Sequence, residues 1–353
     1  MILTGFLYKE DGWELEKLLP LQPLNLIVGK NASGKSKTIK ALGDAISILL
    51  QQKWPSSPLS YDIDLQFTNN KKHIEYHFAI KSGAVVNEIL LIDNEEVLKR
   101  DENSAVLCGE TINPPTNKLI PHVRRDTVRY PNIEQIMLWA EQACGMSFNE
   151  MDIAGDNSTS SFILGNLSSL YNMVDALTET SMDRVISLAK KMDYPMKQIG
   201  CLSVNEIKKI IFMEQGVGPL LGSMLSKGMF RTLYLLICME YLSQKAIPSL
   251  LMIDDLCEGL DYDRSTLLGK FVFDFCKEHN IQLIASSNDT FLMDVVDIEF
   301  WNILNRKGGK VDSINIVNNK NLFDDFAFTG LSNFDFLSSD YIQRHLQQSK
   351  KNE

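Results

Sequence analysis

Eight consecutive residues carry the clearest chemistry in this sequence, because they follow the pattern G-x-x-x-x-G-K-S: Gly29, Lys30, Asn31, Ala32, Ser33, Gly34, Lys35 and Ser36. In such a loop the glycines let the backbone curl, so that consecutive N–H groups face inward and bind phosphate oxygens. Lys35 reaches the β- and γ-phosphates, and the Ser36 hydroxyl becomes a ligand of Mg²⁺. Lys37 follows on the first helical turn. The pattern predicts a nucleotide site with Mg²⁺, bound by residues 29–37.

Two carboxylates at the end of a second apolar run are the next candidates for this site. Asp254 and Asp255 follow residues 249–253, which read as a buried strand. A strand-terminal aspartate in a protein with such a loop holds Mg²⁺, so we expect Asp254 to share the metal with Ser36. Asp255 comes next and is placed to orient the attacking water. With Lys35, these aspartates are predicted catalytic groups.

Three shorter segments complete the constellation. Residues 225–231 (Leu-Ser-Lys-Gly-Met-Phe-Arg) lead straight into a helical pattern, and a serine and a glycine at a helix start form an anion site. A glycine turn with an acidic residue, 258–261, follows the two aspartates. A further apolar run, 281–285, ends in small polar residues: Ser286, Ser287, Asn288 and Asp289. The order and spacing of these segments are more specific than any one of them.

The hydrophobic pattern predicts the elements that carry these residues. Apolar runs at 1–7 and 24–28 read as strands of one sheet, and residues 34–52 as the first helix. Residues 59–107 switch to period-two alternation, which predicts an antiparallel β-meander. Residues 155–160 read as a polar linker. Further helical patterns are predicted at 133–144, 162–177, 182–192 and 204–213.

Two histidines in the meander, His73 and His77, invite a metal-binding interpretation. Residues four apart on a strand lie roughly 13 Å apart, so we expect ordinary strand residues. The six cysteines stand singly, as buried thiols do in a reducing cytosol. The sequence therefore predicts no metal site beyond the Mg²⁺ of the nucleotide.

Composition restricts the class of protein. The 353 residues include 44% hydrophobic and 23% charged residues, which is typical of a globular protein. The longest apolar stretch, 233–242, is interrupted by Glu240 and is too short to cross a membrane. No signal peptide opens the sequence, so we expect a cytoplasmic protein.

The net charge of −10 argues against a protein whose main function is to coat nucleic acid. Basic clusters, explained by solvated faces or by local contact with nucleic acid, lie at 71–72, 124–129, 190–191 and 208–209.

Taken together, the motifs resemble the ABC-type ATPases, and most of all the soluble RecF, SMC and OLD branch rather than the transporters. The resemblance covers residues 1–305 and implies an α/β fold: an ABC-ATPase head with a mixed central sheet, an antiparallel β-subdomain and a helical lobe. The expected parts of this single domain are a P-loop core (1–58), the β-meander (59–109), a mostly helical lobe (110–224), a core with the signature, Walker B, D-loop and switch segments (225–305) and an aromatic-rich extension (306–353).

The resemblance also implies roles for individual residues. ATP is sandwiched between two heads in this family, so Ser226 and the N–H of Gly228 in the signature loop (residues 225–231) would touch the γ-phosphate bound at Lys35 of a second copy. The other implied roles are nucleotide contact for Arg231, the Walker B aspartate for Asp254 and the catalytic base for Asp255. Leu260 and Asp261, within the turn 258–261, would form the D-loop.

Two departures from the family pattern bear on hydrolysis. The family has glutamate at the position of Asp255, and aspartate is one methylene shorter. The family's switch histidine falls on Ser287, which can hydrogen-bond but supplies no imidazolium-like charge. We assign Ser287 a catalytic role and expect slow hydrolysis, unless Asn288 or Asp289 fills the missing role. The Q-loop glutamine stays unassigned.

These implications favour an ATP-dependent switch that forms a homodimer, or a higher homo-oligomer, and gates a protein effector. Relatives of similar size in bacterial defence systems suggest sensing of phage or foreign nucleic acid. The alternatives are a nucleotide-stabilised scaffold with little turnover and a DNA-binding repair ATPase.

Five phenylalanines within residues 321–337 either pack on the edge of the sheet or form a docking surface for a partner.

Overall fold

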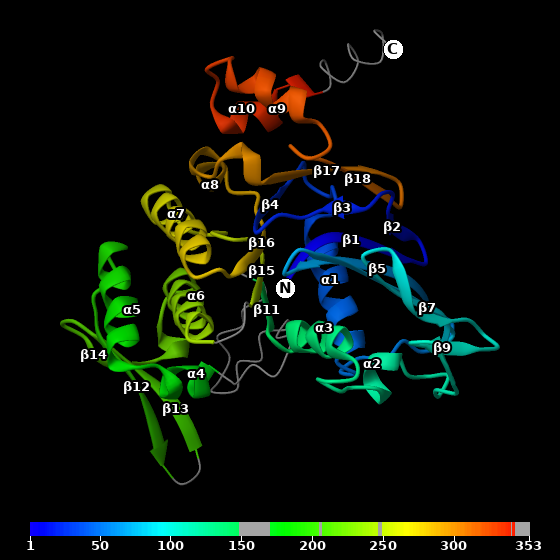
Figure 1. Cartoon of the computed structure of the whole chain (residues 1–353). Helices are drawn as coiled ribbons and strands as arrows, with labels where there is room; N and C mark the ends of the chain where they lie inside the picture. Colours follow the sequence, from blue (N-terminus) through cyan, green and yellow to red (C-terminus); the bar gives the residue numbers. More distant parts are fainter. Residues whose placement is uncertain (148–169, 205–206, 246–248, 340, 343–353) are drawn as a thin grey trace.

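The computed structural model describes residues 1–147, 170–204, 207–245, 249–339 and 341–342. Within these residues, one mixed sheet of 15 strands has the order β10-β9-β8-β7-β6-β5-β1-β2-β18-β17-β4-β16-β15-β11, with β3 paired to β1 (Figure 1). A separate sheet joins β12, β13 and β14. The predicted α/β class with a mixed central sheet is confirmed.

The bounds of the elements follow the chain. The strands are β1 (Ile2–Glu10), β2 (Trp13–Leu15), β3 (Leu19–Pro20), β4 (Leu24–Val28), β5 (Ser60–Asn69), β6 (Lys72–Lys81), β7 (Ala84–Ile92), β8 (Glu95–Arg100), β9 (Ala105–Leu107), β10 (Glu110–Ile112), β11 (Ala143–Ser147), β12 (Met196–Val204), β13 (Ile207–Glu214), β14 (Gly218–Leu221), β15 (Leu250–Asp254), β16 (Gln282–Ser286), β17 (Trp301–Lys307) and β18 (Lys310–Ile314). The helices are α1 (Lys35–Leu49), α2 (Ile120–Val123), α3 (Pro131–Glu141), α4 (Leu170–Ala176), α5 (Glu179–Lys191), α6 (Lys227–Ser243), α7 (Tyr262–Glu278), α8 (Thr290–Val295), α9 (Lys320–Ala327) and α10 (Asn333–Ser338), with short 3₁₀ turns at η1 (Gly222–Met224) and η2 (Ile298–Phe300).

The strands at the centre of the large sheet are parallel. β4 pairs with β16 and β17, and β15 pairs with β16 and β11. Alternate residues of these strands enter two different cores: Leu251 and Ile253 lie in one, Leu250 and Met252 in the other. Parallel strands covered on both faces read as continuous apolar runs, which is why the sequence identified them. Their carboxyl ends lie at one edge of the sheet.

Helices cover both faces of this central sheet (Figure 1). α6 and α7 pack with one core, and α1 and α3 pack with the other. Nearly every residue of α6 from Phe230 to Leu242 is buried, so the protein covers this helix on all sides. Among the described helices, none combines the length and apolar composition that a bilayer crossing requires.

The predicted β-meander is confirmed as β5 to β9. Its strands pair antiparallel in chain order, and β5 also pairs with β1. The meander therefore extends the central sheet instead of forming a sheet of its own. His73 and His77 lie on β6, where each contacts a carboxylate, Glu75 and Asp62 respectively.

The prediction of a helix at 204–213 is wrong. Ile207–Glu214 is strand β13, paired antiparallel with β12 and β14. Its three isoleucines favour a pleated strand once β12 and β14 lie beside it. The predicted helix at 133–144 ends at Glu141, and Cys144 lies on β11. The predicted linker at 155–160 and the first part of the helix at 162–177 lie outside the described residues.

The aromatic residues of the C-terminal extension divide between core and surface. Phe323, Phe326 and Phe336 are buried, and the ring centroids of Phe326 and Phe336 lie 4.4 Å apart. Phe336 also contacts Trp301 at the start of β17. Phe328 is 90% exposed. Three of the five phenylalanines therefore lie in the core, where Phe323 and Phe326 contact Phe336, which in turn contacts the sheet.

A buried carboxyl group joins the meander to the loop that leads into α2. Glu88 on β7 is fully buried and accepts hydrogen bonds from the Tyr76 hydroxyl (2.6 Å) and the Ile120 amide (2.8 Å). The guanidinium of Arg100 lies 3.4 Å from its other oxygen. Arg100 also donates to two carbonyl groups of the loop 115–118. One network therefore holds strands β6 to β8 against this loop.

This network predicts a pH-dependent stability. Burial raises the pKa of Glu88 to about 7, against the opposing hydrogen bonds. The folded chain binds the Glu88 proton more tightly than the unfolded chain does. The stabilisation that protonated Glu88 gives the folded state is therefore complete below the unfolded pKa and is lost as the pH rises through about 7. The unfolding free energy of the wild type should therefore fall by about 2–3 kcal/mol between about pH 5 and about pH 8 because of Glu88. In Glu88→Gln, which cannot lose this proton, that part of the fall should be absent. Urea unfolding at both pH values measures this, and an unchanged pH dependence in the variant would contradict it.

Candidate functional site

The phosphate-binding loop joins the end of β4 to the start of α1. Gly29 and Gly34 have φ angles of 155° and 104°, which favour glycine. A Cβ atom at Gly29 would lie 2.5 Å from the Oγ of Ser33 and 2.7 Å from the carbonyl oxygen of Leu304. Gly34 has no side chain to cap α1, so no cap side chain occupies the first N–H groups of this helix, which can then bind an anion.

Lys35 is 5% exposed, and its ammonium lies within the loop. Its Nζ donates hydrogen bonds to the carbonyl oxygens of Gly29 (2.9 Å) and Lys30 (3.3 Å). Burial lowers the pKa of Lys35, and attraction to Asp255 and Asp254 opposes that change. The side chain of the loop lysine and the two aspartates therefore lie close enough to interact.

The remaining loop residues differ in accessibility. Lys30, Asn31 and Ser36 are exposed, so the Ser36 hydroxyl is open to solvent at the start of α1. Lys37 forms an ion pair with Glu10, and its ammonium lies 5.6 Å from the centre of the Trp13 ring. Lys37 thus points toward β1 and β2, to one side of the loop.

Asp254 and Asp255 follow directly at the end of β15. Because β16 runs parallel beside this strand, Ser286 lies next to them. The Ser286 hydroxyl donates to Asp254 Oδ1 (2.5 Å) and accepts from the Asp255 amide (3.0 Å). Asp255 has φ 56°, a left-handed conformation that aspartate tolerates better than most residues. Ser286 thus binds the carboxylate of Asp254 and the backbone of Asp255.

Ser287 does not face an open site. It is fully buried, its hydroxyl donates to the carbonyl of Leu256 (2.8 Å), and it accepts from the amide of Asp289 (3.0 Å). Asp289 caps α8 by accepting from the amide of Leu292. Asn288, between them, is exposed. The Ser287 hydroxyl therefore joins the loops that follow β15 and β16, and its catalytic role stays a prediction.

The signature loop and the D-loop pack against each other within one copy. Ser226 caps α6 and accepts from the amide of Met229 (3.3 Å). A Cβ atom at Gly228 would lie 3.1 Å from Cδ2 of Leu260 and 3.7 Å from the Tyr194 hydroxyl. Any surface that faces the signature loop therefore lies beside the D-loop as well.

Arg231 and Asp261 occupy supporting positions in these two loops. Arg231 is buried, and burial lowers its pKa while attraction to Glu258 opposes that change. Its Nη1 lies 3.9 Å from the Cβ position of Gly259. Asp261 caps α7 by accepting from the amide of Arg264 (3.0 Å) and also pairs with its guanidinium. Arg231 thus lies beneath the D-loop, away from the surface.

One position at this edge escaped sequence reasoning. β11 is parallel to β15, and Ser147 at its end lies in register with Asp254. Ser147 is buried at the same edge of the sheet as the two aspartates. The helical prediction for 133–144 concealed this short strand. The short run of small and apolar residues after Glu141 was the signal in the sequence that could have indicated strand β11.

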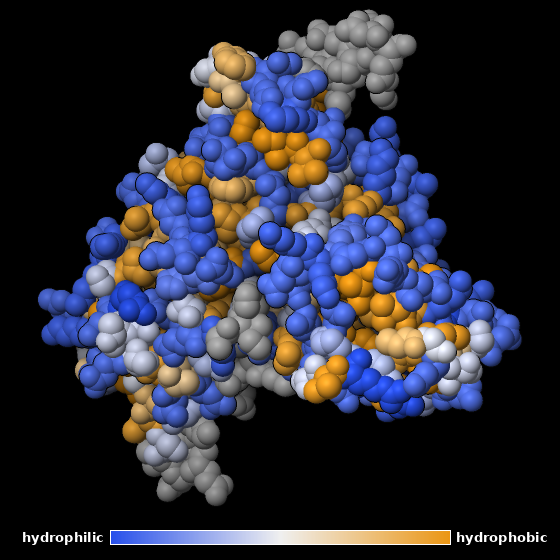
Figure 2. Space-filling model, viewed as in Figure 1, coloured by the Kyte–Doolittle hydropathy of each residue, from blue (hydrophilic) through white to orange (hydrophobic). Residues whose placement is uncertain are grey.

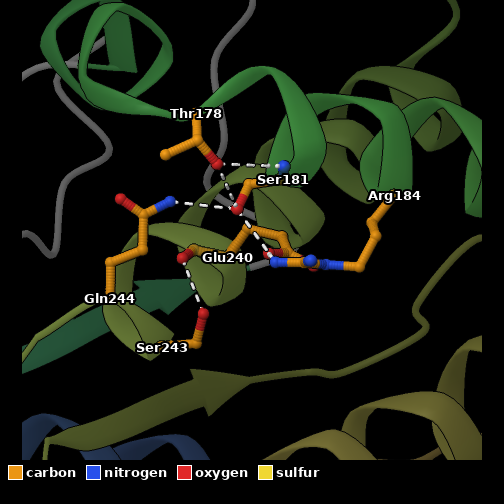
Figure 3. A network of polar contacts seen from close by, with 6 residues as sticks. All are labelled: Thr178, Ser181, Arg184, Glu240, Ser243 and Gln244. Carbon is orange, nitrogen blue, oxygen red and sulfur yellow. Dashed lines mark hydrogen bonds and ion pairs between the residues drawn. The ribbon is translucent and has the colours of Figure 1, made fainter.

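A polar network fixes helix α5 to the helix that begins at the signature loop (Figure 3). Arg184 donates to Glu240 from Nε (2.8 Å) and Nη2 (2.6 Å), and Glu240 is almost fully buried. Ser181 accepts from Arg184 (2.9 Å) and from Gln244 (3.0 Å). This two-bond pairing explains how a carboxylate interrupts the apolar stretch 233–242.

Comparison with solved structures identifies the fold. An SMC head bound to the C-winged helix domain of ScpA covers 91% of this chain and 100% of its own, with a TM-score of 0.56 and 12% identity. An Smc head with an extended coiled coil, bound to the C-terminal domain of ScpA derived from Pyrococcus furiosus, covers 92% and 99%, with a TM-score of 0.50 and 12% identity. No protein-family model and no curated protein sequence matches the chain.

Identity this low establishes the fold and nothing further. The chain has the fold of an ABC-type ATPase head, of the kind found in SMC proteins. Each of three sequence motifs lies at the carboxyl end of a parallel strand. The phosphate-binding loop follows β4, the two aspartates lie at the end of β15, and the small polar segment follows β16.

Proposed function

We propose that this chain binds ATP with Mg²⁺, hydrolyses it slowly, and dimerises around it to switch a protein partner. The observation that carries the proposal is the buried Lys35 ammonium, held by loop carbonyls and attracted by Asp254 and Asp255. A loop lysine facing two carboxylates at the end of a nearby parallel strand is the arrangement that phosphoryl transfer to water uses.

The residues fit Mg²⁺-ATP. Gly29 has no room for a side chain, and the start of α1 offers backbone N–H groups. Ser36 and Asp254 supply the hard oxygen ligands that Mg²⁺ prefers. Mg²⁺-ATP would supply an activated γ-phosphate, whose charge Lys35 neutralises. Asp255 accepts the proton of the attacking water.

The small polar segment after β16 supports this chemistry indirectly. Ser286 holds both aspartates by hydrogen bonds, and Ser287 fixes the neighbouring loop. We assign Ser287 a positioning role and propose that the exposed Asn288 reaches toward the nucleotide. Ser147, in register with Asp254 at the end of the neighbouring strand, is proposed to lie near the metal or its water.

The second half of the site is proposed to come from another copy. Ser226 and Gly228 start a helix with an anion-binding geometry, and ATP bound by one copy would meet this helix start in the other. Arg231 and Asp261 hold the signature loop and the D-loop in shape for that contact. The γ-phosphate distinguishes the two states and therefore supplies the differential binding energy.

A protein effector is the proposed target of the switch. Both SMC heads reported above are bound to a domain of ScpA, and we infer by analogy that this head also engages a separate protein. The five parts expected from the sequence, 1–58, 59–109, 110–224, 225–305 and 306–353, serve as the working division of the head. A role in anti-phage defence stays a prediction.

Lys35→Ala is the first test of this function. Removing the buried ammonium should lower ATP turnover at least about 100-fold, because Lys35 is the lysine held inside the loop, whereas Lys30 is exposed and Lys37 pairs with Glu10. Steady-state phosphate release measures the effect. Lys40→Ala is the matched control, since Lys40 is exposed on the same helix and should leave turnover unchanged. Equal phosphate release by wild type and Lys35→Ala would contradict hydrolysis at this site.

A nucleotide-stabilised scaffold is the second candidate. The burial of Ser287 favours it, because no charged switch residue follows β16 at that position. If wild type and Lys35→Ala both release no phosphate while ATP still drives dimerisation of the wild type, the scaffold is correct and the hydrolytic switch is wrong. The DNA-repair alternative requires salt-sensitive binding to DNA, which a low-salt binding assay with and without ATP would detect.

A further inference from the structure

A cavity of about 250 Å³ lies between the tip of the phosphate-binding loop, the end of β17 and the last described residues of the chain. Its lining consists of residues 30–33, residues 303–306, Ile314, Leu337, Ser339 and Ile342. Figure 1 places the α9–α10 pair beyond β17 and β18, and Figure 2 shows hydrophobic residues at the surface where this pair meets the sheet. The cavity therefore connects the phosphate-binding loop to the C-terminal part of the chain.

The cavity reaches the loop from the face of the sheet opposite to α1. Ile303 and Ile314, which line it, belong to the core that also contains residues of α9 and α10. The residues of α1 belong to the other core. The helix that is expected to bind the phosphates thus packs on one face of the sheet, and the cavity opens on the other.

The lining combines aliphatic side chains with two cations. Ile303, Ile314 and Ile342 are buried, whereas Lys30 and Arg306 are exposed. Among the described residues that line the cavity there is no carboxylate. Small-molecule sites are mostly apolar with a few polar groups that fix the ligand's orientation. A cavity of this composition therefore favours a small organic anion, whose apolar body contacts the isoleucines.

Both cations have donors that can bind an anion. Arg306 donates from Nε to the carbonyl oxygen of Gly308 (2.7 Å). Over the ranges that the structure describes, neither the Nη atoms of Arg306 nor the ammonium of Lys30 pairs with a carboxylate. A guanidinium binds a carboxylate or a phosphate through parallel hydrogen bonds, which are stronger than neutral ones. An anionic group that enters the cavity therefore meets two cations.

A buried hydroxyl group in the loop wall lacks a hydrogen bond. Ser33 is 6% exposed, and its Oγ has no partner among the residues described. A Cβ atom at Gly29 would lie 2.5 Å from this Oγ and 2.7 Å from the carbonyl oxygen of Leu304, so the hydroxyl lies beside the end of β17. A buried hydroxyl without a partner is costly. A ligand held between the loop and β17 would complete its hydrogen bonding.

Lys30 connects the cavity to Lys35. The carbonyl oxygen of Lys30 accepts from Lys35 Nζ (3.3 Å) and from the amide of Ser33 (3.1 Å). The residue that lines the cavity thus also holds the ammonium that is expected to bind the phosphates. An anion in the cavity would repel the phosphates of ATP, because charges interact strongly where little water lies between them.

We propose that this cavity binds a small organic anion with an apolar body of one or two rings, and that the bound anion weakens ATP binding through the loop tip. An apolar cavity of about 150 Å³ holds one benzene ring, so the volume suits such a ligand. The coupling rests on the proposed ATP site, whereas binding of the anion does not. By linkage, ATP weakens binding of the anion by the same factor.

The first test uses 2-naphthoate as the probe and isothermal titration calorimetry as the measurement. Its dissociation constant should be about 1 mM or lower. Neutral 2-naphthamide, which has the same shape, should bind at least about 10-fold more weakly. Arg306→Gln should raise the dissociation constant of 2-naphthoate at least about 10-fold and leave ATP affinity unchanged. Lys307→Gln is the matched control, because Lys307 is the next exposed residue of β17 and does not line the cavity.

Equal affinities for 2-naphthoate in the two glutamine variants would contradict recognition of the anion at this site. A lower ATP affinity in Arg306→Gln would show that the cavity belongs to the nucleotide site, and the inference would be wrong.

Leu337→Trp tests the position of the ligand. Leu337 packs against the core in the cavity wall, so a larger ring there should fill the cavity and abolish binding of 2-naphthoate. Thermal unfolding verifies that the fold of the variant is intact. Unchanged binding by a folded Leu337→Trp chain would show that the probe binds elsewhere, and would overturn the proposed site.

ATP affinity at rising concentrations of 2-naphthoate tests the coupling. It should fall about fivefold or more and then reach a plateau, because both ligands bind at once. A fall without a plateau would mean that the two ligands exclude each other, which contradicts a separate cavity. An unaltered ATP affinity would overturn the coupling. If the wild type binds 2-naphthoate but no ATP, the proposed function and the coupling fail, whereas the anion site is confirmed.

Discussion

Replacing Gly228 with glutamate should abolish ATP-driven dimerisation and leave ATP binding by the single chain intact. A Cβ atom at this position already lies 3.1 Å from Leu260 and 3.7 Å from the Tyr194 hydroxyl, so the larger side chain must turn outward, toward the second copy. Its carboxylate would then face the γ-phosphate bound there, and like charges at close range repel strongly in a water-poor interface. The expected loss of dimer affinity is at least about 1000-fold.

Two measurements are needed for this prediction. Equilibrium binding of a fluorescent ATP analogue reports the single-chain site, and light scattering with ATP reports the dimer. Gly200→Glu is the matched control, because a Cβ at Gly200 on β12 has open space around it and the same charge is added. A Gly228→Glu chain that still dimerises with ATP would exclude the two-copy sandwich.

The central part of the fold was predictable from the sequence because its signals are local. The apolar runs of β4 and β15 and the alternation of β5 and β6 each identify an element within a few residues. Strand β13 and strand β11 were not recognised, because their pairing depends on partners that no local pattern reveals. Their sequences suit a helix or a strand equally well until a neighbouring strand is in place.

For the candidate site too, the sequence predicted the positions of the loops better than the contacts of individual side chains. The order of the motifs predicted which loops follow the parallel strands, and these loops do lie at one edge of the sheet. Family correspondence led to a catalytic role for Ser287, and in the structure its hydroxyl binds the backbone of Leu256 and Asp289. Ser286, one residue earlier, holds both aspartates instead. Adjacent residues at the end of a strand point to opposite faces, and sequence alone does not fix which of them faces the site.

Asp255→Asn should reduce phosphate release about 100-fold and prolong the lifetime of the ATP-bound dimer. The amide has the same shape as the carboxylate but does not accept a proton from the attacking water, a step worth about 10²–10⁴-fold. Loop binding through Lys35 and the first helical turn is retained, so ATP still binds. Asparagine tolerates the left-handed conformation at φ 56° as well as aspartate does, so backbone strain does not complicate the result.

Single-turnover phosphate release and dimer dissociation after ATP dilution measure the two effects separately. Asp274→Asn, an exposed change of the same type on α7, should alter neither. The comparison with Lys35→Ala is decisive for the role of Asp255: loss of the lysine should remove turnover and dimer together, whereas loss of the base should remove turnover alone. If Asp255→Asn hydrolyses ATP at the wild-type rate, the proton acceptor is another group, and the exposed Asn288 and the capping Asp289 after β16 become the positions to replace next.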